Sequence, residues 1–258
     1  HQRYSTNTFP TWRLAQPFRV IAHNGEINTL SGNVNWMKSH EPRLASPKFG
    51  QQIEDLKPIV QLGSSDSAAL DSVFELVIRA GRDLPAAKAL LVPEAAANNQ
   101  LLSDEVKALY SYFNAIMEPW DGPAALAAYD GRWVLGGMDR NGLRPMRYSI
   151  TKDGLLIAGS EAGMVRVPEE DVVEKGRLGP GQMIAVDLAE GRLWRDTELK
   201  EMLAKRRNYR KWIRNIVHLE KVAGRDVTET AELERDELRR RQLAAGWTIE
   251  DLETVLQP

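Results

Sequence analysis

The chain of 258 residues contains no cysteine. Disulfide bonds, thiolate metal sites and iron–sulfur clusters held by cysteine are therefore excluded within it. It has no apolar run of about 18 residues, so no segment is expected to span a membrane. It also lacks a basic excess, with 34 Lys and Arg against 36 Asp and Glu, so nucleic acid is not an expected partner. The residues from His1 onward do not form a signal peptide. The absence of cysteine fits a cytoplasmic location.

The composition that is present fits a globular protein. Hydrophobic residues make up 43% of the chain, and its length fits one domain with extensions or two small domains. The chain does not begin with Met, and it ends at Pro258 directly after a helical pattern. We interpret both ends as cuts in a longer polypeptide.

The first half is predicted to contain one short strand and two helices. Residues 18–23 form an apolar strand pattern that runs into Asn-Gly, a dipeptide typical of turns. Residues 64–81 begin with the capping sequence Ser-Ser-Asp-Ser and continue with apolar residues at helical spacing, and Gly81 is expected to end this helix. A second amphipathic helix is predicted over residues 103–118.

The second half changes character. Residues 123–195 contain short apolar runs separated by turn sequences, which predict antiparallel hairpins. These sequences are Asp130-Gly131, Asp153-Gly154, Gly179-Pro180-Gly181 and Glu190-Gly191. From residue 196 onward the pattern is helical, with a solvated, charge-laced helix over Leu233–Arg241 and a last short helix from Thr248. This order favours an α+β fold over a parallel, doubly wound sheet.

Three polar clusters precede residue 70, at residues 1–8, 23–28 and 64–67. Each has a structural explanation when it is taken singly. The first fits a surface turn with Arg3 in an ion pair, the second fits a hairpin turn, and the third fits a helix cap that accounts for Asp66.

Taken together and in this order, the clusters resemble a known family. The strings HQRYSTNTFPTW, AHNGEINT and SSDSAALD are similar to those of class II glutamine amidotransferases, enzymes with an N-terminal nucleophile and a four-layer αββα fold. The strings MEPWDGPAAL, GGMDRNGLRPMRY and EKGRLGPGQMIAVD resemble the glutamate synthase family in particular. The resemblance implies that residues 1–215 are the C-terminal part of the amidotransferase domain, incomplete at its N-terminus. Residues 216–258 would be a helical connector toward a central domain.

The resemblance also implies a role for five residues. Arg3 would bind the α-carboxylate of L-glutamine, with a hydroxyl contact from Thr6, and Asp66 would bind the α-ammonium group. The side-chain amide of Asn24 and the backbone N–H of Gly25 would form an oxyanion hole, which acyl transfer requires. Gly25 also permits close backbone approach.

The nucleophile of the family is an N-terminal cysteine whose own α-amine acts as the base. Because this chain has no cysteine, we expect that residue to lie upstream of His1. His1 and His23 are therefore interpreted as scaffold and not as bases. A structural ion-pair or turn role is predicted for four further polar residues, namely Asp139, Arg140, Arg144 and Glu161.

The implied parent enzyme makes two L-glutamate from L-glutamine and 2-oxoglutarate. It would carry FMN and an iron–sulfur cluster outside this chain, and this chain is expected to hold no cofactor. Its partners would be the central and FMN-binding domains, and a NADPH-oxidising small subunit is one further partner that the resemblance allows. NADPH and ferredoxin both remain open as electron donors. Two alternatives also remain open: another class II amidotransferase, or a non-catalytic glutamine-binding module.

Overall fold

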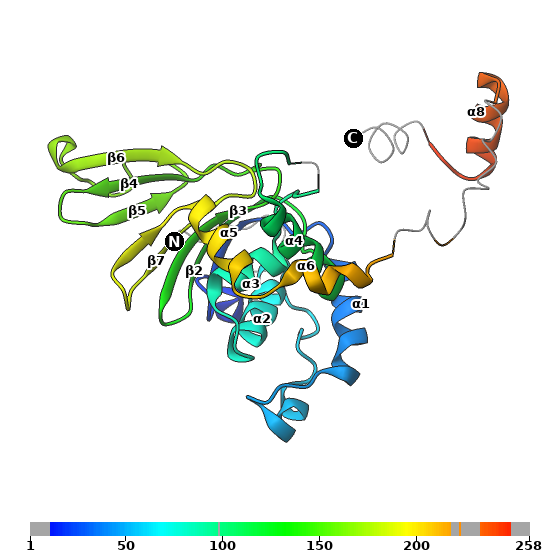
Figure 1. Ribbon diagram of the computed structural model, residues 1–258, viewed down its shortest axis with the longest axis horizontal. Helices are drawn as coiled ribbons and strands as arrows, with labels where there is room; N and C mark the ends of the chain where they lie inside the picture. Colours follow the sequence, from blue (N-terminus) through cyan, green and yellow to red (C-terminus); the bar gives the residue numbers. More distant parts are fainter. Residues whose placement is uncertain (1–10, 98, 218–221, 223–232, 249–258) are drawn as a thin grey trace. The chain divides into compact units, whose positions relative to one another are not determined.

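The computed structural model describes residues 11–97, 99–217, 222 and 233–248, which fall into two compact units. The first unit ends at Ile213 and the second begins at Arg214. The first unit contains two β-sheets and the helices that pack with them (Figure 1). The α+β class is confirmed. The division into a domain over 1–215 and a connector over 216–258 stays a prediction.

The elements are named as in Figure 1. The α-helices are α1 (Leu30–His40), α2 (Asp66–Arg79), α3 (Leu84–Leu91), α4 (Asp104–Ile116), α5 (Asp196–Lys205), α6 (Tyr209–Trp212) and α8 (Arg235–Ala244). The strands are β1 (Ile21–Gly25), β2 (Ala124–Tyr129), β3 (Trp133–Met138), β4 (Arg147–Thr151), β5 (Leu156–Gly159), β6 (Val172–Arg177), β7 (Met183–Asp187) and β8 (Arg192–Trp194). Short 3-10 helices are η1 (Trp12–Leu14), η2 (Glu41–Arg43), η3 (Gly50–Leu56), η4 (Glu169–Asp171) and η5 (Ile213–Asn215).

The described strands form two antiparallel sheets, one of five strands in the order β1-β2-β3-β7-β8 and one of three in the order β5-β4-β6. The hairpins β2–β3, β4–β5 and β7–β8 confirm the predicted antiparallel pattern. The expectation of a hairpin turn at Gly179-Pro180-Gly181 is wrong. That segment joins β6 to β7, which lie in different sheets, and the backbone N–H of Gly181 donates to the carbonyl of Asp139 instead.

The core lies between the five-stranded sheet and a layer of helices. Helices α2, α3 and α5 contact β1, β3 and β7 respectively. Along β2, Ala124, Leu126 and Ala128 are buried while the alternating residues are more exposed, as expected for a sheet with one face on a core. All eight residues of α3 are buried, including Lys88.

The two predicted helices are confirmed with small changes in their bounds. The N-cap of α2 is Ser65, whose side chain accepts from the backbone N–H of Ala68, and the N-cap of α4 is Ser103, which accepts from Val106. Each cap satisfies a backbone donor that the first helical turn leaves free. Helices α1 and α3 were not predicted.

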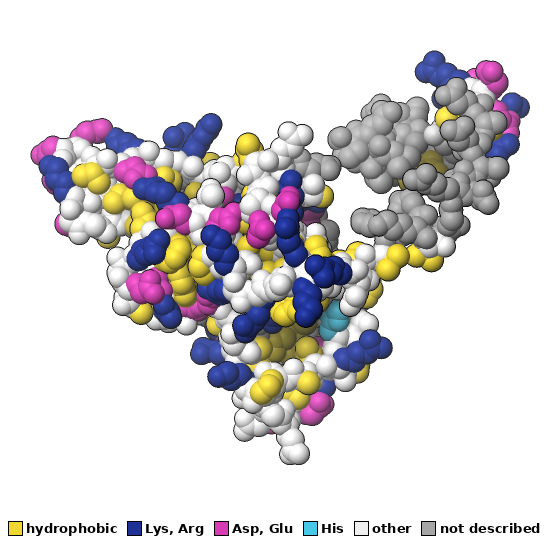
Figure 2. Space-filling model, in the orientation of Figure 1, with side chains coloured by type: hydrophobic (Ala, Val, Ile, Leu, Met, Phe, Trp, Pro, Cys, Tyr) yellow, Lys and Arg dark blue, Asp and Glu magenta, His cyan; other side chains and the backbone are white. Residues whose placement is uncertain are grey.

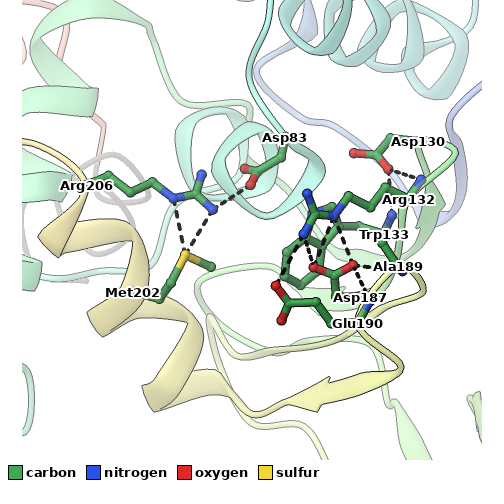
Figure 3. Close-up of polar contacts among 9 residues, drawn as sticks. All are labelled: Asp83, Asp130, Arg132, Trp133, Asp187, Ala189, Glu190, Met202 and Arg206. Atoms are coloured by element: carbon green, nitrogen blue, oxygen red, sulfur yellow. Dashed lines mark hydrogen bonds and ion pairs between the residues drawn. The ribbon is translucent and has the colours of Figure 1, made fainter.

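Charged groups hold the turns at one end of the five-stranded sheet (Figure 3). Arg132, in the β2–β3 turn, donates from Nη2 to Asp187 Oδ2 at 2.5 Å. Asp130, in the same turn, accepts from the backbone N–H of Leu84 at the start of α3, at 3.0 Å. The register of β1 on β2 places Gly25 beside the start of β2, whereas this turn follows the end of β2. The charged turns therefore lie at the end of the sheet opposite Gly25.

In the second unit, every residue of α8 is at least partly exposed. Glu237 pairs with Arg240 at 3.3 Å and with Arg241 at 2.8 Å. This confirms the solvated, charged helix predicted near Leu233–Arg241. The short helix predicted from Thr248 extends into residues that lie outside the described ones.

Figure 2 shows basic and acidic side chains intermixed over the displayed face of the first unit. The balanced charge of the sequence is thus distributed without a single-sign surface on that face. Across the residues that the structure describes, none of the helices combines the length and the apolar character needed for a membrane crossing.

Candidate active site

Asn24 and Gly25 are the last two residues of β1, paired with Ala125 and Ala124. The prediction of a turn at this dipeptide is wrong, because both residues pair with β2 in the sheet. Gly25 has φ +147°, and a Cβ there would lie 1.7 Å from the carbonyl oxygen of Pro123. Only glycine fits a position with this dihedral angle and this approach.

A second glycine makes a matching approach from the neighbouring segment. Gly122 also has φ +147°, and a Cβ there would lie 2.0 Å from the carbonyl oxygen of Glu26. The backbone N–H of Glu26 donates to the carbonyl of Pro123 at 2.9 Å. Residues 25–28 and 121–124 therefore lie backbone against backbone, and this contact fixes the path of the chain beyond Asn24.

Asp66 is the first residue of α2. Its Oδ2 accepts from the backbone N–H of Ile27 at 2.9 Å, across 39 positions in the sequence. Its side chain is 19% exposed, so part of the carboxylate remains accessible. Because Ser65 caps the helix, the alternative explanation of Asp66 as the cap is wrong. The structure thus brings Asp66 beside the segment that follows Asn24 and Gly25.

His23 lies beneath this arrangement with its side chain fully buried. Its Nδ1 lies 2.8 Å from Ser67 Oγ and 4.0 Å from Asp66 Oδ2, and its Nε2 lies 3.3 Å from the Pro123 carbonyl oxygen. Burial lowers the pKa of His23, an effect that the nearby Asp66 carboxylate opposes. These contacts agree with the predicted scaffold role.

Asp139 follows β3 and organises the loop beside this site. Its buried carboxylate accepts from the backbone N–H groups of Ala124 at 2.9 Å, Asn141 at 2.8 Å and Gly142 at 2.9 Å. Such multiple acceptance by one buried carboxylate fixes a turn. The predicted structural role of Asp139 is confirmed.

The other three polar residues of that group differ among themselves. Arg140 pairs with Asp121 at 2.6 Å, which confirms its predicted ion-pair role. Arg144 is exposed, and its charge contributes to the lowered pKa of His23. Glu161 is exposed and lines a recess beside the three-stranded sheet. The structural roles of Arg144 and Glu161 stay predictions.

Arg3 and Thr6 lie outside the described residues, so the carboxylate end of the clamp stays a prediction. No group of three or more His, Cys, Asp or Glu side chains suited to a metal ion occurs within the described ranges. A recess of about 680 Å³ is lined by Arg19, Asp71 and Glu75 among others, and includes neither Asn24 nor Asp66. The candidate site is therefore defined by backbone and side-chain contacts near Gly25.

Among the described residues, sequence reasoning missed four buried charged groups, namely Asp71, Lys88, Asp187 and Lys200. Asp71, within α2, accepts from the backbone N–H groups of Arg19, Val20 and Ile21 at 3.2, 2.9 and 2.9 Å. Lys88, within α3, donates to the carbonyl of Gly181 at 3.2 Å. For Asp71 and Lys88, the only signal in the sequence was a lone charged residue inside an apolar stretch, and such a residue does not reveal which group it will bond to.

The family model of class II glutamine amidotransferases matches residues 1–212. The chain belongs to this family. Membership also supports the four-layer αββα sandwich that the sequence resemblance implies. The matched residues cover the first unit almost to its end at Ile213.

Curated relatives are similar over the whole chain. The large chain of NADPH glutamate synthase from Azospirillum brasilense is 60% identical over 260 residues, and ferredoxin-dependent glutamate synthase 2 from Synechocystis sp. is 47% identical over 262 residues. The large chain of NADPH glutamate synthase from Bacillus subtilis is 44% identical over 259 residues. All of this chain is covered in each case, but only 17% of each relative.

Solved structures are more distant. The glutamine phosphoribosylpyrophosphate amidotransferase of B. subtilis, solved with ADP and GMP, is 21% identical, with a TM-score of 0.37. The match covers 76% of this chain and 34% of that one. A glutamine aminotransferase class-II domain protein from Silicibacter pomeroyi is 19% identical, with a TM-score of 0.36, and the match covers 69% of this chain and 67% of that one. At these TM-scores the likeness adds nothing to the family membership.

Proposed function

We propose that this chain binds L-glutamine and stabilises the oxyanion in the glutamine-hydrolysing domain of a glutamate synthase. The parent would make two L-glutamate from L-glutamine and 2-oxoglutarate. One observation carries the proposal beyond family membership: the Asp66 carboxylate accepts from Ile27 N–H, two residues beyond Gly25. An anchor for a substrate ammonium group and two candidate oxyanion donors therefore share one small region.

The proposed chemistry is acyl transfer through a thioester. Attack on the amide carbon of glutamine moves negative charge onto the carbonyl oxygen. The Asn24 side-chain amide and the Gly25 backbone N–H would donate to that oxygen. Both donors are neutral, and the sheet and the Pro123 contact fix the Gly25 backbone before reaction. Fixed donors of this kind gain most when the charge is fully developed.

Substrate orientation would come from opposite charges at the two ends of the amino-acid backbone. Asp66 would take the α-ammonium group, and Arg3 and Thr6 would take the α-carboxylate. A zwitterionic clamp of this type selects α-amino acids over simple amides. The placement of Asp66 supports this assignment, and the part of Arg3 and Thr6 rests on the resemblance.

The remaining parts of the reaction belong elsewhere in the parent. The attacking thiol must come from a cysteine outside this chain, since the chain contains none. FMN and an iron–sulfur cluster are proposed for other parts of the parent, together with its central and FMN-binding domains, an electron-donor partner and a cytoplasmic location. The similarity to relatives named for NADPH and for ferredoxin keeps both donors open.

The test is the Asn24→Ala substitution in the full-length parent. Glutamine-dependent kcat is expected to fall by about 10²–10³, because one oxyanion donor is lost, while the KM for glutamine changes little. Activity with free ammonia should survive, since it bypasses this site. As a matched control, Asn24→Asp keeps the size of the side chain but places a negative charge near the oxyanion. Near-wild-type glutaminase activity in Asn24→Asp would refute the assignment.

A further inference from the structure

His23 connects the two halves of the candidate site. Its imidazole touches Ser67, the residue after Asp66, on one side and the Pro123 carbonyl on the other. The same carbonyl accepts from Glu26 N–H and makes the close approach to Gly25. The two candidate substrate contacts, which belong to β1 and α2, thus meet at a single buried ring.

The partners of the ring determine its tautomer. A carbonyl oxygen only accepts, so Nε2 carries a proton to donate to Pro123. In the neutral ring, Nδ1 is then an acceptor, and the hydroxyl of Ser67 donates to it at 2.8 Å. The Ser67 hydroxyl therefore does not donate to Asp66, whose Oδ1 lies 3.5 Å from it.

Protonation would reverse this arrangement. A protonated Nδ1 would donate to Ser67 Oγ and free the serine hydroxyl hydrogen for Asp66. It would also place a positive charge 4.0 Å from Asp66 Oδ2. Both changes would partly neutralise the Asp66 carboxylate and so weaken its attraction for the ammonium group of the substrate, which is the role that the proposed function gives it.

We propose that His23 is a positioning residue that acts as a neutral, Nε2-protonated ring. Through Pro123 it fixes the backbone that presents Gly25 N–H, and through Ser67 it keeps the Asp66 carboxylate free for a substrate ammonium group. The inference rests on the proposed function of Asn24, Gly25 and Asp66.

The electrostatic surroundings of the ring support the neutral form. Burial is the largest cause of the lowered pKa of His23, and the Arg144 charge lowers it further. The Asp66 and Asp139 carboxylates and the Pro123 hydrogen bond act in the opposite direction. The net effect lowers the pKa of His23 below its ordinary value of 6.5, which favours the neutral ring at pH 7.

Two substitutions in the full-length parent separate the two contacts. The amide oxygen of Asn is close to the position of Nδ1, so His23→Asn keeps the Ser67 contact and loses the Pro123 contact. The amide nitrogen of Gln is close to the position of Nε2, so His23→Gln keeps Pro123 and loses Ser67. We expect His23→Asn to lower glutamine-dependent kcat about tenfold with little change in KM, the effect of one lost hydrogen bond. We expect His23→Gln to raise the KM for glutamine about three- to tenfold with a smaller effect on kcat.

The pH profile gives a readout that a purely structural role would not move. In the wild type, the KM for glutamine is expected to rise as the pH falls through the pKa of His23. Both variants should lack this rise, since neither amide titrates. If a variant does not fold, the ring 15N shifts of His23 in the wild-type protein at pH 7 still decide the tautomer. A proton on Nδ1 would overturn the inference.

Asn24→Ala in the same assay separates this inference from the proposed function. If Asn24→Ala lowers kcat while both His23 variants keep wild-type kcat, KM and pH profile, His23 has no positioning role and the proposed function stands. If Asn24→Ala is also fully active, the proposed function fails and the inference on His23 fails with it.

Discussion

Lys88 is a buried cation whose removal should stabilise the protein at neutral pH. It is fully buried in α3, and its ammonium group donates to one carbonyl, that of Gly181, at 3.2 Å. Loss of hydration by burial is the main cause that lowers the pKa of Lys88 from 10.5 to about 8, with a further contribution from Lys200. The charged form is thus disfavoured in the folded state.

The change in the free energy of unfolding follows from the difference between these two pKa values. Each pH unit corresponds to about 1.4 kcal/mol, so charging Lys88 costs the folded state about 3 kcal/mol at neutral pH. Lys88→Met keeps the length of the side chain and removes the charge, but it leaves the Gly181 carbonyl without its donor, at a cost of about 1–2 kcal/mol. We therefore expect the variant to be more stable by about 1–2 kcal/mol near pH 7.

The sign of the pH dependence makes the test specific. Between about pH 8 and pH 10.5 the unfolded state holds a proton on Lys88 that the folded state lacks, so wild-type stability rises with pH. The variant lacks this gain, so its stability relative to the wild type should fall by about 2–3 kcal/mol between about pH 7 and pH 10, which turns its advantage into a disadvantage. Urea unfolding of both proteins across this range measures the difference, in which other titrations cancel.

The matched control is Lys200→Met. Lys200 is equally buried but pairs with Glu94 at 2.5 Å and Asp196 at 2.7 Å. Its removal leaves these two carboxylates without their cation and should destabilise the protein near neutral pH. If the free energies of unfolding of the wild type and Lys88→Met change in parallel with pH, burial does not lower the pKa of Lys88 and the reasoning is refuted.

Other substitutions test the support of the site. Asp71→Asn should lower the free energy of unfolding by about 2–4 kcal/mol in urea titrations, because one amide oxygen cannot accept from three backbone N–H groups. Gly25→Ala should unfold or strongly destabilise the chain, since the added Cβ meets the Pro123 carbonyl, whereas Gly131→Ala, in open space at φ +102°, should cost about 1–3 kcal/mol from backbone strain alone. Ser65→Ala should cost about 1 kcal/mol in thermal unfolding through loss of the cap, and an unchanged melting temperature would contradict the capping assignment.

Features that depend on local sequence were predictable. Helix α2 has a serine cap and an apolar stripe, and the hairpins have turn dipeptides flanked by apolar runs. Helix α3 was missed because LPAAKALL is buried on every side and therefore shows no amphipathic period. The Asn24-Gly25 dipeptide was predicted as a turn because its neighbours in sequence do not reveal that β2 would pair with it.

The candidate site was only partly predictable for a similar reason. The resemblance pointed to Asn24, Gly25 and Asp66, but nothing in the spacing of these residues indicates the bond from Ile27 to Asp66. The contacts of His23 likewise join three segments that are distant in sequence. Arg3 and Thr6 lie outside the described residues, so their placement remains a prediction.

The paired approach of Gly25 and Gly122 has a consequence for protein engineering. At this contact, main-chain atoms of residues 25–28 and 121–124 touch directly, beside the buried ring of His23. The spacing of the two segments is therefore set by these backbone contacts and not by side-chain rotamers. Mutating neighbouring side chains should alter the charge and polarity of the site far more easily than its spacing. A library that aims to change the spacing of these two segments would have to redesign the backbone of residues 121–124.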